Sequence, residues 1–107
     1  MSRSLNSSPG IEVIGSAHNG AEAVALAAEL RPDVVIMDVE MPIMDGLEAT
    51  RRIKQAHPAI AVVLISGSAG LLASSVSAGA DGYITKPFSA DSLIYEILKI
   101  FERKDAR

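Results

Sequence analysis

The stretch Asp33-Val34-Val35-Ile36-Met37-Asp38-Val39-Glu40-Met41-Pro42-Ile43-Met44-Asp45-Gly46 decides the fold of this chain. Its apolar residues, 34 to 37, are continuous and do not alternate with polar ones. That pattern predicts a strand buried on both faces of a parallel sheet. Asp38 follows this strand directly, at the end where open α/β sheets place their chemistry. Asp38 is therefore a candidate nucleophile, although the commoner role of an aspartate in this place is to cap the next turn.

Strands and helices alternate around this stretch. The predicted strands are 11–15, 34–37, 60–65 and 82–85, and the predicted helices are 21–30, 46–56, 68–78 and 89–101. This β-α-β-α-β-α-β-α order predicts a doubly wound α/β fold with a parallel sheet and right-handed crossovers. The polar, turn-rich residues 1–10 are expected to form a flexible N-terminal segment, and residues 11–103 are expected to form one domain.

The helix boundaries and exposed faces follow from capping residues and residue types. Asn19 and Ser89 are expected to cap the helices that follow them. The cations of helix 46–56 are expected to face water: Arg51, Arg52 and Lys54.

The last two helices differ in apolar content. Helix 68–78 is rich in Ser, Ala and Gly, so we expect a weakly anchored and mobile helix. Its only sizeable apolar residues, and hence its expected anchors, are Leu71, Leu72 and Val76. The last helix carries an apolar stripe made of Leu93, Ile94, Ile97, Leu98 and Phe101. The charged residues 102–107 after it are expected to fray.

Composition limits the function classes. With 107 residues the chain is long enough for one domain with one modest core, and because aromatics are only 4%, aliphatic residues must fill it. The net charge is −3 and no Lys/Arg cluster occurs, which argues against a nucleic-acid or anionic-membrane surface. No cysteine is present, so disulfides and thiolate metal sites are excluded. No signal-peptide or membrane-spanning run is visible, and the expected location is the cytoplasm.

Three polar residues lie at, or next to, the C-terminal ends of predicted strands. They are Asp38, Ser66 and Lys86. Because a parallel sheet gathers these ends at one edge, we expect the three side chains to lie close together. A carboxylate can attack phosphorus, an ammonium can neutralise the transferred oxygens, and a hydroxyl can donate a hydrogen bond to one of them. Each residue alone has a plainer reading as a turn or surface residue, but the combination suits phosphoryl transfer.

Two motifs resemble a known family. Val35 to Gly46 is similar to the phosphoacceptor segment of two-component response-regulator receiver domains. Ala78-Gly79-Ala80-Asp81-Gly82-Tyr83-Ile84-Thr85-Lys86-Pro87-Phe88 resembles their last strand and Lys-Pro loop, and Leu64-Ile65-Ser66-Gly67 matches the segment with the switch hydroxyl. The resemblance runs from about Ile11 to Phe101 and implies a flavodoxin-like, CheY-like sheet, here with four β-α units in place of five.

The resemblance also implies roles for individual residues. Asp38 would be phosphorylated by a histidine kinase or phosphotransfer protein, Lys86 would bind the phosphoryl oxygens, and Ser66 would turn towards them. Tyr83 would follow Ser66 with a change of rotamer. Glu40 would offer its backbone carbonyl to Mg²⁺, with Asp38 as a second ligand. The Lys86–Pro87 bond would be cis, and the residues that shape the loop would be Met41, Pro42 and Gly46.

One departure from the family concerns the metal. Receivers begin with a central strand that ends in an acidic pair, followed by the first helix, and that pair holds the Mg²⁺. In this chain no Asp or Glu precedes Glu12. Mg²⁺ requires several oxygen ligands in octahedral geometry. We therefore expect weak or absent Mg²⁺ binding and poor phosphorylation of Asp38, in a chain that reads as an N-terminally truncated receiver.

The same departure affects the sheet. The family's strand order is 2-1-3-4-5, so a missing first strand would leave open edges on the strands at Ile11 and Val34. Those two strands could pair directly, a second copy of the chain could cover the sheet, or another protein could supply the strand. A homodimer or larger assembly is the expectation that we favour.

Four functional readings remain open at this stage. The first is a receiver module of a phosphorelay, which is not itself an enzyme. The second is a degenerate receiver that acts through dimerisation or protein binding without phosphorylation. The third is a small hydrolase, which would need Asp45 or Glu40 as an acid beside Asp38. The fourth is that the sequence represents a partial coding region.

Overall fold

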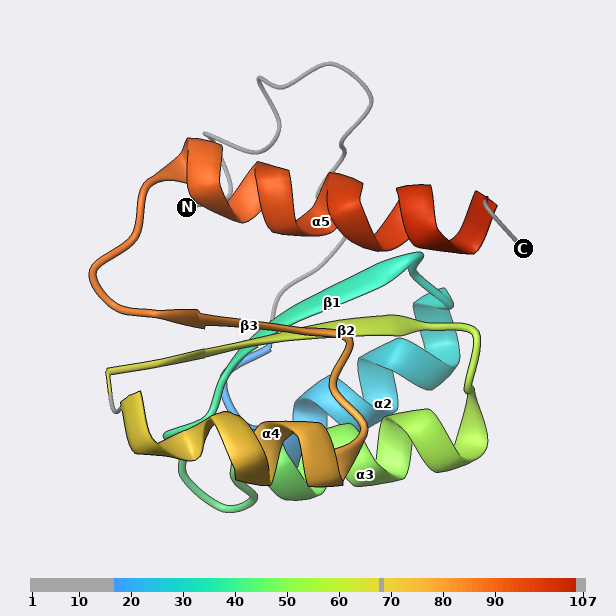
Figure 1. Ribbon diagram of the computed structural model, residues 1–107. Helices are drawn as coiled ribbons and strands as arrows, with labels where there is room; N and C mark the ends of the chain where they lie inside the picture. Colours follow the sequence, from blue (N-terminus) through green and yellow to red (C-terminus); the bar gives the residue numbers. More distant parts are fainter. Residues whose placement is uncertain (1–16, 68, 106–107) are drawn as a thin grey trace.

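The computed structural model describes residues 17–67 and 69–105 (Figure 1). Its elements are α2 (Gly20–Leu30), β1 (Val34–Asp38), α3 (Gly46–Ala56), β2 (Ala61–Ser66), the 3-10 turn η1 (Ala69–Leu71), α4 (Leu72–Ala78), β3 (Gly82–Thr85) and α5 (Ala90–Asp105). The described sheet has three parallel strands in the order β1-β2-β3. The α/β prediction is confirmed. The strand predicted at 11–15 and the segment 1–10 lie outside the described residues.

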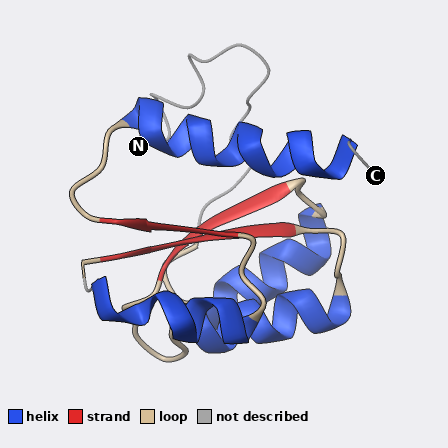
Figure 2. Ribbon diagram, in the orientation of Figure 1, coloured by secondary structure: helices blue, strands red, loops and turns tan. Residues whose placement is uncertain are grey.

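The sheet lies between two layers of helices (Figures 1 and 2). Helix α5 covers one face, and α2, α3 and α4 cover the other. Strand β2 is buried along its whole length, which agrees with its uninterrupted apolar sequence. The core on the α5 face contains Ala61, Val63, Ile84, Leu93, Ile97 and Ile100. The core on the other face contains Ala23, Ala27, Met37, Val39, Ala49, Ile53, Ile60, Val62 and Leu64.

Side-chain caps begin the helices at the predicted places. The side chain of Asn19 accepts the Glu22 N–H at 2.9 Å, and Ser89 Oγ accepts the Ser92 N–H at 3.1 Å. Asp45 caps α3 by accepting the Glu48 N–H at 2.9 Å. Each contact satisfies a backbone donor that the first helical turn leaves without a partner. None of the described helices is long and apolar enough to cross a membrane.

Helix α4 corrects the prediction for residues 68–78. The helix buries the small residues Ser75 and Ala78, whereas Leu72 and Val76 are 54% and 66% exposed. Ser75 Oγ donates a hydrogen bond to the Leu71 carbonyl at 2.8 Å, so this buried hydroxyl has a hydrogen-bond partner. Small side chains allow α4 to lie close to its neighbours, and its two larger apolar residues consequently point outwards.

Helix α5 is longer than predicted, and the face that it buries differs at one predicted position. It continues to Asp105, because residues after Phe101 include good helix formers and no Gly or Pro. Leu93 and Ile97 are buried as predicted, but Leu98 is exposed and Ile100 occupies the core in its place. Gly82 of β3 leaves room for this packing, since an added Cβ would meet Ile100 and Val63 at 3.4 and 3.3 Å.

Lys54 does not face water, contrary to the prediction. Its side chain is only 18% exposed, and Nζ lies 2.9 Å from Asp81 Oδ2. The same ammonium donates to the carbonyls of Ile60 and Pro58, and Asp81 Oδ2 also accepts the Val62 N–H at 2.9 Å. These contacts fasten the end of α3 to the starts of β2 and β3.

We expect Asp81→Ala to lower the free energy of unfolding by about 1–3 kcal/mol. The change removes the acceptor of the Val62 N–H and the counter-charge of Lys54, and unpaired buried groups cost about this much. Urea unfolding followed by circular dichroism would measure the difference. Asp33→Ala, at an exposed position before β1, is the matched control. Equal unfolding midpoints for the two variants would contradict this role of Asp81.

Candidate functional site

The three predicted residues meet at one edge of the sheet. Asp38 is the last residue of β1, Ser66 is the last residue of β2, and Lys86 follows β3 directly. In the register of the sheet Asp38 lies opposite Ile65, and Ser66 lies opposite Thr85, so the three strands end nearly level. The Lys86 N–H donates to the Ser66 carbonyl at 2.8 Å and fixes the start of the loop after β3.

Asp38 and Lys86 form an ion pair across the end of β2. Lys86 Nζ lies 2.8 Å from Asp38 Oδ1, and the two side chains are 48% and 44% exposed. Oδ1 itself is buried, and no described donor meets it at the angles of a well-aligned hydrogen bond. The short distance is the decisive property, because Coulomb attraction depends on separation and little on angle.

The charge of Lys86 follows from this pairing. The Asp38 carboxylate beside the ammonium raises the pKa of Lys86 above its ordinary value, and Glu40 adds a smaller effect of the same sign. Lys86 is therefore a fixed positive charge at neutral pH. Such a charge is what a phosphoryl group needs at its oxygens.

The Ser66 hydroxyl is hydrogen-bonded to Glu40, which follows β1 in the chain. Ser66 is fully buried, and its Oγ donates a hydrogen bond to Glu40 Oε1 at 2.8 Å. Glu40 is exposed, so its carboxylate reaches inward from the loop. The family resemblance assigned Glu40 a role through its backbone carbonyl, and the hydrolase reading considered its side chain as an acid beside Asp38. The contact between this side chain and Ser66 was not predicted.

Two glycines allow the loop after Asp38 to fold back on the site. The Gly46 N–H donates to the Val39 carbonyl at 2.8 Å, and a Cβ at Gly46 would overlap the Asp38 carbonyl oxygen. Gly20 approaches the same loop from α2, where a Cβ would overlap the Met44 carbonyl oxygen. Only glycine permits these approaches, which agrees with the loop-shaping role expected of Gly46.

The loop after β3 has the predicted backbone. The Lys86–Pro87 peptide bond is cis. Tyr83 of β3, three positions before Lys86, is half-buried and packs against the core on the α2-α3-α4 side. The change of rotamer expected of Tyr83 stays a prediction.

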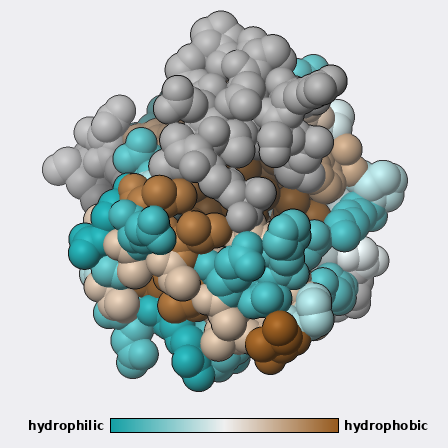
Figure 3. Space-filling model, turned by 180° about the vertical axis from the view of Figure 1, so that it is seen from behind, coloured by the Kyte–Doolittle hydropathy of each residue, from teal (hydrophilic) through white to brown (hydrophobic). Residues whose placement is uncertain are grey.

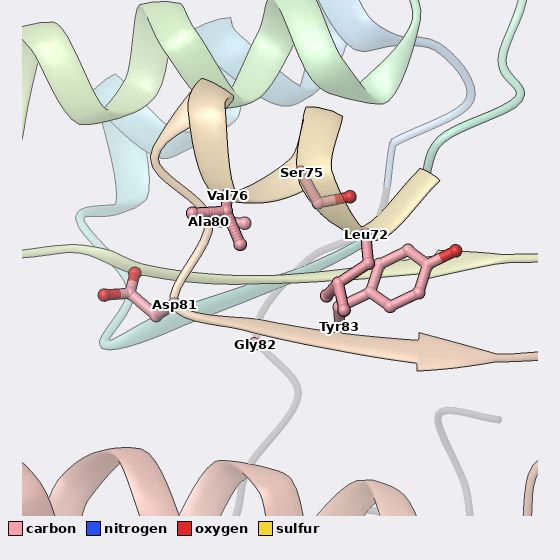
Figure 4. A pocket seen from close by; sticks show the side chains of 7 residues that line it. All are labelled: Leu72, Ser75, Val76, Ala80, Asp81, Gly82 and Tyr83. Carbon is pink, nitrogen blue, oxygen red and sulfur yellow. The ribbon is translucent and has the colours of Figure 1, made fainter. Parts of the chain in front are cut away.

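A hollow of about 130 Å³ lies between α4 and β3, away from Asp38 (Figure 4). The hollow is lined by Leu72, Ser75, Val76, Ala80, Asp81, Gly82 and Tyr83. None of the three polar residues at the strand ends contributes to it.

The described residues do not by themselves fit a Mg²⁺ ion. They contain no group of three or more His, Cys, Asp or Glu side chains placed to hold a metal. Asp38 Oδ1 already contacts Lys86, and Glu40 Oε1 already accepts from Ser66. Mg²⁺ demands near-octahedral oxygen coordination, which one carboxylate and one backbone carbonyl supply only in small part.

Comparisons with known proteins identify the family. The family model for the response regulator receiver domain matches residues 1–98. The chain belongs to this family. The receiver is 44% identical over 85 residues to the chemotaxis protein CheY of Halobacterium salinarum, covering 78% of this chain and 71% of that protein. It is 36% identical over 92 residues to the transcriptional regulatory protein LnrK of Bacillus subtilis, covering 84% of this chain and 42% of LnrK.

Solved structures agree with this assignment. A LuxR-family two-component response regulator from Aurantimonas sp. superposes with a TM-score of 0.86 at 33% identity, covering 92% of this receiver and 72% of that chain. The chemotaxis protein CheY4 of Vibrio cholerae superposes with a TM-score of 0.82 at 29% identity, covering 92% of this receiver and 84% of that chain. The receiver spans less than half of LnrK but most of the CheY proteins.

We expect Asp38→Asn to lower the pKa of Lys86. Asn has the same shape but lacks the negative charge that raises this pKa in the wild-type receiver. Because the raised pKa belongs to the folded state, the pairing stabilises the fold below the ordinary lysine pKa and loses this effect as the pH rises through the raised value.

NMR titration of the Lys86 side-chain carbon next to Nζ would measure both midpoints in the alkaline range. Lys99, which pairs with Glu96 far from Asp38 in the chain, serves as an internal control in both proteins. An unchanged Lys86 midpoint in Asp38→Asn would show that the ion pair is absent in solution.

Proposed function

We propose that this receiver takes part in phosphorelay signalling, with Asp38 as its phosphoacceptor. The observation that supports this most directly is the 2.8 Å ion pair between Asp38 and Lys86, which brings a carboxylate and an ammonium group together where the strands end. The phosphodonor would be a histidine kinase or a phosphotransfer protein. In the step itself an Asp38 oxygen bonds to phosphorus as the phosphorus–nitrogen bond to the donor histidine breaks, and the nitrogen keeps the electron pair.

We also propose that phosphorylation is slow. An incoming phosphoryl group would face the two carboxylates of Asp38 and Glu40, and among the described residues the cation paired with Asp38 is Lys86. An additional cation would normally offset the charge on the transferred oxygens, but the described residues offer few ligands for one. If phosphorylation is negligible, the receiver would act as a phosphorylation-independent interaction module, which is the second candidate function.

A hydrolase is the weaker reading. Some relatives carry enzymatic names, such as the protein-glutamate methylesterase of Geobacillus kaustophilus, but this chain spans only 28% of that protein. Asp45 is engaged in capping α3, and Glu40 accepts from Ser66, so neither is placed as an acid beside Asp38. We therefore propose a signalling module that is not itself an enzyme.

We expect only a minor fraction of the full chain to gain one phosphoryl group when it is incubated with Mg²⁺ and phosphoramidate. The physical reason is the excess of negative charge at the site. Intact-mass spectrometry at timed intervals would give the fraction, and Asp38→Asn should give none. Label that persists in Asp38→Asn would contradict the phosphoacceptor assignment. Rapid and complete labelling of the wild-type chain would contradict slow phosphorylation.

We further propose that the receiver forms a homodimer or a larger assembly. Val34, Val35 and Ile36 of β1 are only half-buried, whereas β2 beside them is fully buried. Seen from behind, apolar residues also gather next to the grey atoms (Figure 3). A second copy of the chain would cover such apolar surface.

We expect light scattering during size-exclusion chromatography to give at least twice the 11.2 kDa mass of one chain at micromolar concentration. Burial of the half-exposed apolar side chains of β1 provides the driving force. Val35→Lys places a charge on this strand and should shift the mass towards one chain. A mass of one chain for the wild-type protein across the concentration range would overturn the proposed assembly.

A further inference from the structure

We propose that Glu40 is a positioning residue that holds the Ser66 hydroxyl while Asp38 is unphosphorylated. We propose further that Glu40 competes with an incoming phosphoryl group. The second part depends on the phosphoacceptor role proposed for Asp38. The first part depends only on the contact between the two side chains.

The hydrogen bond between Ser66 and Glu40 is short and joins two separate elements. Ser66 Oγ donates to Glu40 Oε1 at 2.8 Å, and Ser66 is fully buried. The acceptor is a carboxylate, and hydrogen bonds to ionised groups are shorter and stronger than neutral ones. The two residues are 26 positions apart in the chain, so the bond ties the loop after β1 to the end of β2. This hydrogen bond therefore favours the Ser66 rotamer that directs Oγ at Glu40.

A phosphoryl group on Asp38 would interact with Ser66 Oγ and Lys86 Nζ, and Glu40 already interacts with both of these groups. Its oxygens would be placed to accept from Ser66 Oγ and to pair with Lys86 Nζ. The Glu40 carboxylate occupies the first of these groups and acts by charge on the second. Two anions cannot share one hydroxyl proton, and they repel each other at close range.

Release of Glu40 would cost little. Glu40 is exposed, so its carboxylate can rotate into water and remain hydrated. Ser66 is buried and cannot take that route. The exchange therefore replaces one anionic acceptor of Ser66 by another, and the Glu40 side chain is the part that moves away.

Side-chain NMR tests the hold on Ser66 without any phosphorylation. The α–β proton couplings of Ser66 report its χ1 rotamer. We expect a single rotamer in the wild-type chain and in Glu40→Gln, because the Gln carbonyl can still accept the hydroxyl proton. We expect couplings that differ from those of the wild-type chain in Glu40→Ala, which lacks the carboxylate that accepts from Ser66. Wild-type couplings in Glu40→Ala would overturn the proposed hold. Glu48→Gln, on the exposed surface of α3, should leave the couplings unchanged.

Labelling with phosphoramidate tests the competition on the same variants. We expect Glu40→Ala to accelerate phosphorylation of Asp38 by about tenfold, the change in a rate or equilibrium that corresponds to losing one charged hydrogen bond. Glu40→Gln, which loses only the charge, should fall between Glu40→Ala and the wild-type chain. Glu48→Gln should label at the wild-type rate.

Failure of the proposed competition can be distinguished from failure of the proposed phosphoacceptor role. Equal labelling rates for the wild-type chain and Glu40→Ala would overturn the competition and leave Asp38 as the phosphoacceptor. Absence of label from every variant would overturn the phosphoacceptor role and the competition together. In that case the NMR couplings still decide whether Glu40 holds Ser66.

Discussion

The ion pair between Asp38 and Lys86 is the contact around which the sheet edge is arranged. Its partners come from the two outer strands of the described sheet, with β2 between them. The pair can form because all three strands end nearly level and because Gly46 lets the loop after β1 turn back against the Asp38 carbonyl. A shift of one residue in the register of β2 would separate the two charges, so a precise sheet is a condition for this site.

The two ends of β3 serve different purposes. At its start, Asp81 and Lys54 form a largely buried pair that also satisfies backbone groups. At its end, Lys86 and Asp38 are about half exposed, and exposed ion pairs contribute little to stability. The first pair thus stabilises the fold, whereas the second keeps two opposite charges accessible. A contact that contributes little free energy of folding can be broken and remade, as the phosphoacceptor role proposed for Asp38 would require.

Topology explains why the sequence was enough to find Asp38, Ser66 and Lys86. Each follows an apolar strand, and the parallel arrangement of the strands brings these positions together independently of the side-chain contacts. Lys54 was predicted wrongly because a cation on a helix usually faces water, and only the tertiary structure places Asp81 beside it. The outward direction of Leu72 and Val76 also depends on tertiary packing, since a helix rich in Ser and Ala can bury its small face. The direction of the Glu40 side chain is not predictable either, because a loop has no periodicity to set it.

The charges around Asp38 bear on the reactivity that we propose for it. Among the described groups at the strand ends, Asp38 and Glu40 are negative and Lys86 is positive, so an incoming phosphoryl group would be a third anion beside one cation. Correct geometry does not remove this barrier, because repulsion acts before any bond to phosphorus forms. The balance can be changed by adding a cation or by removing the Glu40 carboxylate. Only the second change also removes an acceptor of the Ser66 hydroxyl, and for that reason Glu40 influences both the charge and the hydrogen bonding of the site.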